Sequence, residues 1–154
     1  GAYAGSRALM EQVAPTGPVY QAGTLSGNPV AMAAGLAQLN IIPDHPEIYT
    51  VMETSASYIA NHLRASAEKH GIAMQVNQIG SLLCPYFTET PVNCYAAAKK
   101  SDTKWYAAYF NGMLKRGIYL APSQFEAMFV SSVHTQNDLA CTVQAAEETL
   151  SEMA

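Results

Sequence analysis

Charged side chains are scarce in this chain. They make up 13% of its 154 residues, compared with roughly a quarter in ordinary globular domains. The 8 Lys and Arg residues are outnumbered by 12 Asp and Glu residues, so the net charge is −4 and the basic surface that nucleic-acid binding requires is absent. Because 49% of the residues are hydrophobic, the scarcity of charge indicates surfaces that another domain or subunit covers.

Long apolar runs and paired cysteines are also missing. No run of about 18 or more apolar residues occurs, which excludes a membrane-spanning helix, and no basic segment precedes an apolar one as in a signal peptide. The three cysteines, Cys84, Cys94 and Cys141, show no CxxC spacing. Neither a metal site nor a disulfide framework is therefore expected, and we predict buried or half-buried free thiols in a reducing compartment.

Hydrophobic periodicity predicts a chain that mixes helices and strands. Apolar residues surround the segment 28–42, which indicates a buried helix, whereas a single apolar face marks a longer helix between Pro46 and Gly71. Further helices are expected over 6–13, 103–116 and from Thr135 onward, strands over 73–78, 81–87, 118–120 and 129–133, and a polar loop over 88–101. This pattern is typical of the α+β (α/β) class, with a small, mostly antiparallel sheet and helices on one face.

A polar, glycine-containing loop runs directly into the apolar helix at 28–42. Gly23 and Gly27 let the backbone approach a ligand closely. Thr24 adds a hydroxyl donor, and Asn28 is a good helix N-cap. Backbone N–H groups and the positive end of the helix dipole would then face the loop, an arrangement that suits an anion. The alternative interpretation is an ordinary helix start, because short motifs of this kind often match by chance.

Two segments carry a resemblance to a known family: VAPTGPVYQAGTLSGNP before the helix, and LAPSQFEA at residues 120–127. They closely resemble the glutamate-1-semialdehyde 2,1-aminomutases, which are pyridoxal-phosphate enzymes of the class-III aminotransferase family. The resemblance covers the whole chain but not the whole enzyme. It implies a fold-type I transferase, with residues 1–42 as the end of the large cofactor-binding domain and residues 43–154 as the C-terminal small domain.

The resemblance also implies roles for particular residues. Gly23 and Thr24 match the loop that holds the phosphate of pyridoxal 5'-phosphate across the interface of a homodimer. Glu126 matches an acid that contacts the amine of the substrate or an intermediate. Its immediate neighbours are apolar, a setting in which a carboxylate needs a partner, whereas the alternative is a solvated loop acid. Met128 stands where the family usually has glycine, which alters the local backbone or the pocket.

The implied activity is the conversion of glutamate-1-semialdehyde to 5-aminolevulinate for tetrapyrrole synthesis. The family's Schiff-base lysine lies upstream of the position that matches Gly1, and no lysine here matches it, so we expect a C-terminal fragment that is inactive alone. We expect a cytoplasmic protein, or a plastid protein if the source is a plant.

Two alternatives stay open, namely another class-III aminotransferase and a non-catalytic interaction or dimerisation module. Residues 117–154 contain no Lys or Arg. A substrate carboxylate is commonly held by a bidentate arginine. The absence of Lys and Arg therefore indicates that this region binds a substrate amine rather than a substrate carboxylate.

Overall fold

The computed structural model describes residues 3–154, which fall into two units: one ends at His45 and the other begins at Pro46. The first unit contains a largely irregular segment with the short helix α1 (Arg7–Met10), followed by the helix α2 (Pro29–Asp44). The predicted range of 28–42 ends two residues early, because α2 continues through Pro43. None of the described residues of the first unit is buried. Helix α2 is therefore not buried by the described residues of its own unit, and its cover by another domain or subunit stays a prediction.

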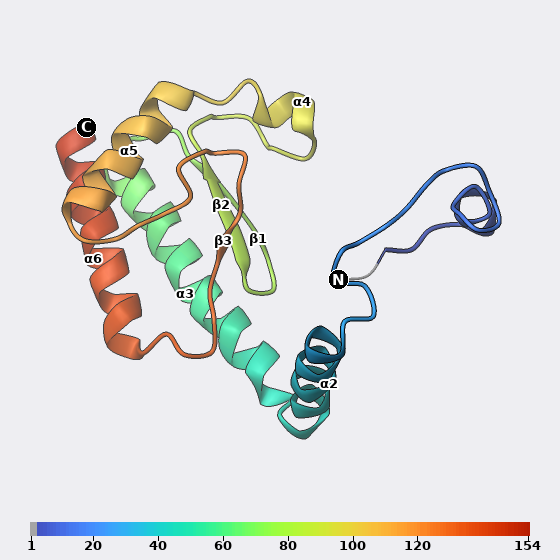
Figure 1. Ribbon diagram of the computed structural model, residues 1–154. Helices are drawn as coiled ribbons and strands as arrows, with labels where there is room; N and C mark the ends of the chain where they lie inside the picture. The colour runs from blue at the N-terminus through green and yellow to red at the C-terminus, as the bar shows by residue number, and fades with distance from the viewer. Residues whose placement is uncertain (1–2) are drawn as a thin grey trace. The chain divides into compact units, whose positions relative to one another are not determined.

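The second unit combines a three-stranded sheet with three long helices. Its elements, in chain order, are α3 (Glu47–Lys69), β1 (Gln75–Ile79), β2 (Leu82–Tyr86), α4 (Tyr95–Ala98), α5 (Thr103–Lys115), β3 (Met128–Phe129) and α6 (Gln136–Met153). The strand order is β1-β2-β3, and both pairs are antiparallel. Figure 1 shows α3, α5 and α6 on one side of the sheet. The predicted α+β class is confirmed, with an antiparallel sheet and helices on one face.

The core of the second unit lies between the sheet and these three helices. Leu63, Tyr109 and Leu150 are each at most 1% exposed. Helix α3 packs against β1, β2 and α6, and α6 packs in turn against α5. Helices α5 and α6 approach so closely that a Cβ atom at Gly112 would lie 2.4 Å from Cγ2 of Thr149. Only a glycine permits this approach without displacing the neighbouring side chain.

Turn and capping residues set the ends of these elements. The Asp138 N–H donates to the Thr135 hydroxyl (3.2 Å), and the Thr135 N–H donates to the Asp138 carboxylate (2.7 Å). This reciprocal pair is a capping box, and it begins α6. Gly80 joins β1 to β2 with φ of +52°, a left-handed conformation that glycine adopts without strain.

A polar cluster joins the C-terminal end of α3 to α6. The Glu147 carboxylate accepts hydrogen bonds from Lys69, Ser66 and His70, the last at 3.0 Å. The hydrogen bonds from Lys69, Ser66 and His70 lower the pKa of Glu147 to about 2. The cluster therefore favours the ionised carboxylate in the folded protein.

The later strands are shorter than the sequence predicts. Residues 118–120 form no strand, the predicted strand 129–133 is reduced to Met128 and Phe129, and the predicted loop 88–101 contains α4. Strand β2 pairs with β1 along its whole length but with β3 only at Leu82 and Leu83. Before Met128 the chain lies outside the sheet, where the Gln124 carbonyl accepts from the Cys84 thiol.

The three cysteines are free, as predicted, but they differ in exposure. Cys84 is buried in β2, whereas Cys94 and Cys141 are exposed. The expectation of buried or half-buried thiols is therefore correct for Cys84 only. Cys94 directly precedes the exposed start of α4, and Cys141 lies on the outer face of α6.

Candidate functional site

The first candidate group lies in the loop that leads into α2. The Ser26 N–H donates to the Gly23 carbonyl (3.0 Å), and the Asn28 N–H donates to the Leu25 carbonyl (3.1 Å), so the chain makes two turns in succession. A Cβ atom at Gly23 would lie 2.6 Å from the Ser26 hydroxyl. The first turn therefore requires a residue without a side chain at position 23. Thr24, the next residue, is exposed.

The first N–H groups of α2 already have hydrogen-bond partners, so they are not free to bind a ligand at this loop. The Asn28 side chain accepts hydrogen bonds from the N–H groups of Val30 (3.0 Å) and Ala31 (3.1 Å), and the proline at the first helical position has no N–H. The predicted N-cap at Asn28 is confirmed, and because its side chain accepts from these N–H groups they are not free donors for an anion. Within residues 3–154, the N–H groups of Gly23 and Thr24 and the Thr24 hydroxyl make no hydrogen bond.

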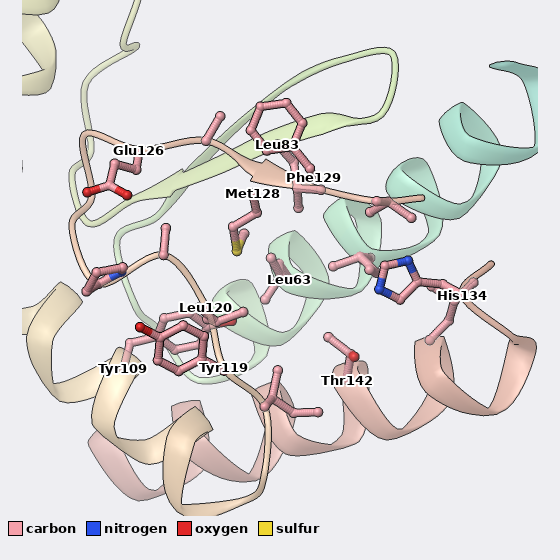
Figure 2. A pocket seen from close by; sticks show the side chains of 17 residues that line it. Leu63, Leu83, Tyr109, Tyr119, Leu120, Glu126, Met128, Phe129, His134 and Thr142 are labelled. Carbon is pink, nitrogen blue, oxygen red and sulfur yellow. The ribbon is translucent and has the colours of Figure 1, made fainter. Parts of the chain in front are cut away.

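The second candidate group surrounds a cavity of about 600 Å³ in the second unit. Its walls are mostly apolar and come from α3, β2, α5, α6 and residues 118–130. Figure 2 shows Glu126 and His134 at opposite ends of the cavity, with the Met128 side chain between them. Among the described residues that line the cavity, Glu126 is the only carboxylate and none is Lys or Arg. The charge of the cavity therefore suits a cation better than an anion.

Glu126 itself is exposed at the rim of this cavity. The sequence-based argument that its apolar neighbours require a partner for the carboxylate is therefore wrong, since water can solvate the side chain. The Glu126 N–H donates to the Ser123 carbonyl (3.1 Å), and this turn directs the chain back toward β3. Met128, two residues on, belongs to the cavity wall, so its bulk does reduce the space beside Glu126.

His134, which the sequence suggests is a surface or capping residue, lines the cavity. The Ser131 N–H donates to Nδ1 of His134 (3.0 Å). Nδ1 also lies 3.1 Å from the Ser131 hydroxyl and 3.3 Å from the Ser131 carbonyl, so the turn before α6 holds this edge of the ring. The spacing of the four histidines gave no signal for this contact, which depends on the turn before α6.

The loop Ala121–Glu126, which we call the Glu126 loop, is held from below by buried side chains. The Tyr106 hydroxyl donates to the Ala121 carbonyl (2.6 Å), and the Cys84 thiol donates to the Gln124 carbonyl (3.2 Å). Burial raises the pKa of Tyr106 to about 12, with smaller contributions from the charges of Cys84 and Glu126. Burial also raises the pKa of Cys84. Both groups thus keep their protons at neutral pH and remain donors. Sequence reasoning missed both, because helical spacing marks the aromatics of α5 only as core.

The residues singled out in the sequence lie in different units. Gly23 and Thr24 are adjacent in the first unit, whereas Glu126 and Met128 belong to the second. The five lysines also lie apart from the cavity. None of them is among its lining residues, and Lys69 is engaged by Glu147.

Two other kinds of site are not found in the described part of the chain. No group of three or more His, Cys, Asp or Glu side chains among residues 3–154 is arranged to hold a metal ion. Over the same residues, no helix combines the length and the hydropathy needed to cross a membrane.

Sequence comparison finds relatives over almost the whole chain. A family model described as aminotransferase class-III matches residues 1–148. A protein from Ruminiclostridium cellulolyticum named glutamate-1-semialdehyde 2,1-aminomutase is 58% identical over 152 residues, which cover 99% of this chain and 35% of that protein. A protein of the same name from Deinococcus radiodurans is 50% identical over 151 residues, covering 96% and 34% respectively. The chain thus spans 34–35% of the length of these curated relatives.

Structure comparison finds the same fold in larger proteins. A β-phenylalanine aminotransferase from Variovorax paradoxus matches with a TM-score of 0.72 and 26% identity, over 96% of this chain and 34% of that chain. A structure described as a transaminase with PLP bound also has a TM-score of 0.72, at 22% identity, over 97% of this chain and 34% of that chain. The second similarity, at this level of identity, concerns the fold alone.

Proposed function

Because this chain belongs to the class-III aminotransferase family, we propose that it forms the C-terminal part of a pyridoxal 5'-phosphate-dependent aminomutase. The proposed reaction converts glutamate-1-semialdehyde to 5-aminolevulinate in tetrapyrrole synthesis. The observation that carries this proposal is the 58% identity, over 99% of the chain, to a relative named for that substrate. Residues 1–42 would belong to the large domain and residues 43–154 would form the small domain. The chain alone would be inactive, because none of its lysines lines the cavity.

The loop at Gly23 is suited to the phosphate of the cofactor. A phosphate dianion needs several hydrogen-bond donors, and adjacent backbone N–H groups with a hydroxyl supply them. Gly23 and Thr24 offer such donors without internal partners, and the space that a Cβ atom at Gly23 would need is already taken by Ser26. In the proposed homodimer this loop would hold the phosphate in the site of the partner subunit. The bound cofactor supplies an electron sink for the amine-transfer chemistry.

Glu126 would bind the amine of the substrate or an intermediate at the rim of the cavity. Its carboxylate attracts an ammonium group and holds it in one orientation. The cavity contains no Lys or Arg that would hold a second carboxylate, which argues against an ordinary aminotransferase with a dicarboxylate donor. The carboxylate of glutamate-1-semialdehyde would then be bound by a part of the enzyme outside this chain.

A homodimer and a cytoplasmic location complete the proposal. Val30, Leu36 and Leu39 of α2 are each more than 60% exposed, and an apolar helix surface of this kind suits a contact with another domain or subunit. The three free cysteines suit a reducing compartment.

Replacing Glu126 tests the proposal directly. The experiment uses a chimera in which this chain replaces the matching 152 residues of the R. cellulolyticum relative. Glu126→Gln removes the charge and keeps the shape, so single-turnover rates should fall while the melting temperature stays nearly constant. Glu89→Gln, at an exposed loop position, is the matched control and should keep the rates of the unmodified chimera. Normal rates with a much lower melting temperature for Glu126→Gln would show that the residue is structural.

Replacing Thr24 tests the phosphate loop separately. In the same chimera, Thr24→Val should weaken cofactor binding by about 1.5–3 kcal/mol, the range for a hydrogen bond to a charged group. Thr54→Val, at an exposed position of α3, should not change it. Cofactor titration followed by absorbance measures both affinities, and an unchanged affinity for Thr24→Val would refute the assignment.

A further inference from the structure

The Glu126 loop owes its position to side chains that do not themselves reach the cavity rim. It contains no helix or strand, so backbone ladders do not fix it. The Glu126 N–H bonds only within the loop, to the Ser123 carbonyl. Any precision in the placement of the Glu126 carboxylate must therefore come from contacts between the loop and the core beneath it.

Four such contacts are present, and all come from buried side chains. The Tyr106 hydroxyl on α5 donates to the Ala121 carbonyl at 2.6 Å. The Cys84 thiol on β2 faces the Gln124 carbonyl at 3.2 Å and, more distantly, the Glu126 carbonyl at 3.7 Å. The Gln124 amide, in turn, donates to the Ala98 carbonyl at the end of α4 (3.3 Å). Tyr106 is 3% exposed and Gln124 is 2% exposed, so these contacts are shielded from water.

Tyr106 makes the shortest of these contacts, and it acts at the first residue of the loop. It lies on α5 and itself belongs to the buried core, with its ring centroid 6.5 Å from that of Tyr109, so the surrounding side chains restrict the ring. A hydroxyl on a rigid ring fixes the carbonyl that it binds more narrowly than a thiol, which is a weaker donor.

We propose that Tyr106 is a positioning residue for the amine-transfer reaction: its hydrogen bond to the Ala121 carbonyl fixes the Glu126 loop and thereby places the Glu126 carboxylate against the amine. The inference rests on the proposed function of Glu126. Tyr106 does not touch the substrate, and its effect on the reaction passes through Glu126.

The test is a double-mutant cycle in the chimera. Tyr106→Phe removes only the hydroxyl, and it should lower kcat about three- to tenfold with little change in KM, the size expected for one neutral hydrogen bond. In a Glu126→Gln background the same substitution should cause no further loss, because the group that it positions is gone. Tyr58→Phe, which removes an exposed tyrosine hydroxyl from α3, is the control and should keep the unmodified rate.

Each result of the cycle is informative. A normal rate for Tyr106→Phe, or losses that multiply with those of Glu126→Gln, would overturn the inference while leaving the role of Glu126 intact. A normal rate for Glu126→Gln would refute the proposed role of Glu126 and, with it, this inference.

A second variant guards against a folding defect. If Tyr106→Phe does not fold, Cys84→Ala removes the second anchor of the loop and should show the same pattern with a smaller loss. Losses from Cys84→Ala that multiply with those of Glu126→Gln would overturn the inference equally.

Discussion

The two units of this chain bury their apolar residues to very different extents. In the second unit, Leu63, Met113 and Leu150 are at most 1% exposed, and helices and sheet enclose them. In the first unit, none of the described residues is buried, although α2 is apolar on all sides. Similar apolar content therefore leads to a core in one unit and to bare surface in the other.

The difference shows that hydrophobicity produces a core only where a second layer is available. Helix α3 has one apolar face, and the sheet and α6 cover it. Helix α2 offers more apolar surface, but its own unit contributes only α1 and irregular chain. The first unit therefore depends on surfaces outside itself, whereas the second has the layered structure of a domain.

The largest expected effect comes from separating the units. Residues 46–154 expressed alone should keep their helix content and unfold in one cooperative transition, because their core is complete. Residues 1–45 alone should show no cooperative transition. Far-UV circular dichroism with thermal unfolding measures both. A cooperative transition in residues 1–45, or none in residues 46–154, would contradict the difference between the units.

A matched pair of leucine truncations gives the next largest effect. Leu63→Ala, in the core of the second unit, should cost about 2–5 kcal/mol. Leu36→Ala, at a position of α2 that is 61% exposed, should cost less than about 0.5 kcal/mol. Urea unfolding of the whole chain measures both. A large cost for Leu36→Ala in the chimera but not in the chain alone would show that the remaining part of the enzyme covers α2.

Two helical glycines should respond to alanine with opposite signs. At Gly112 the new methyl group would meet Thr149 at 2.4 Å, so Gly112→Ala should destabilise the second unit by about 1–3 kcal/mol. At Gly35 nothing lies within 4 Å, so Gly35→Ala should favour α2 by about 0.5–1 kcal/mol through helix propensity. Thermal unfolding and helix content are the measurements. Equal effects at both positions would contradict the difference in packing.

The smallest expected effect concerns the pH dependence of the second unit. The pKa of Glu147 is about 2 in the folded protein and 4.5 when unperturbed. Its stabilising contribution is therefore complete above pH 4.5 and is lost as the pH falls toward 2. The Glu147 side chain is 35% exposed, so solvent screening limits this contribution to less than about 1 kcal/mol.

Glu147→Gln should flatten the stability curve in this acid range. Glu53→Gln, at an exposed position of α3, should leave the curve unchanged. Urea unfolding at pH 5, 4 and 3 would measure both, and a Glu147→Gln curve as steep as that of the unmodified chain would refute the assignment.

Local signals predicted the long helices well, because their causes lie within a few residues, whereas the short helix α4 was missed and α1 is shorter than predicted. Asp102, which caps α5, and the pair Thr135 and Asp138 each set a helix start through contacts no more than three residues away. The family resemblance was likewise carried by short segments, and the class-III family model confirms it.

Features that depend on distant partners were less predictable. The predicted strand over 118–120 does not form, since an apolar segment becomes a strand only where a neighbour offers free backbone groups. Burial of α2 likewise depends on a partner surface, which its own unit does not supply. Gly23, Thr24 and Glu126 were singled out by the family resemblance, and their roles remain proposals. The support of the Glu126 loop by Tyr106 joins residues 15 positions apart, which no periodicity could reveal.

The bare surface of α2 has a colloidal consequence. Only three charged residues, Arg7, Glu11 and Asp44, occur in the first 45 positions of the chain. Electrostatic repulsion between two such segments is therefore weak, and added salt changes it little because few charges are present to be screened. Self-association through this part of the chain would depend on protein concentration and temperature rather than on ionic strength, and would weaken on cooling, as apolar contacts do.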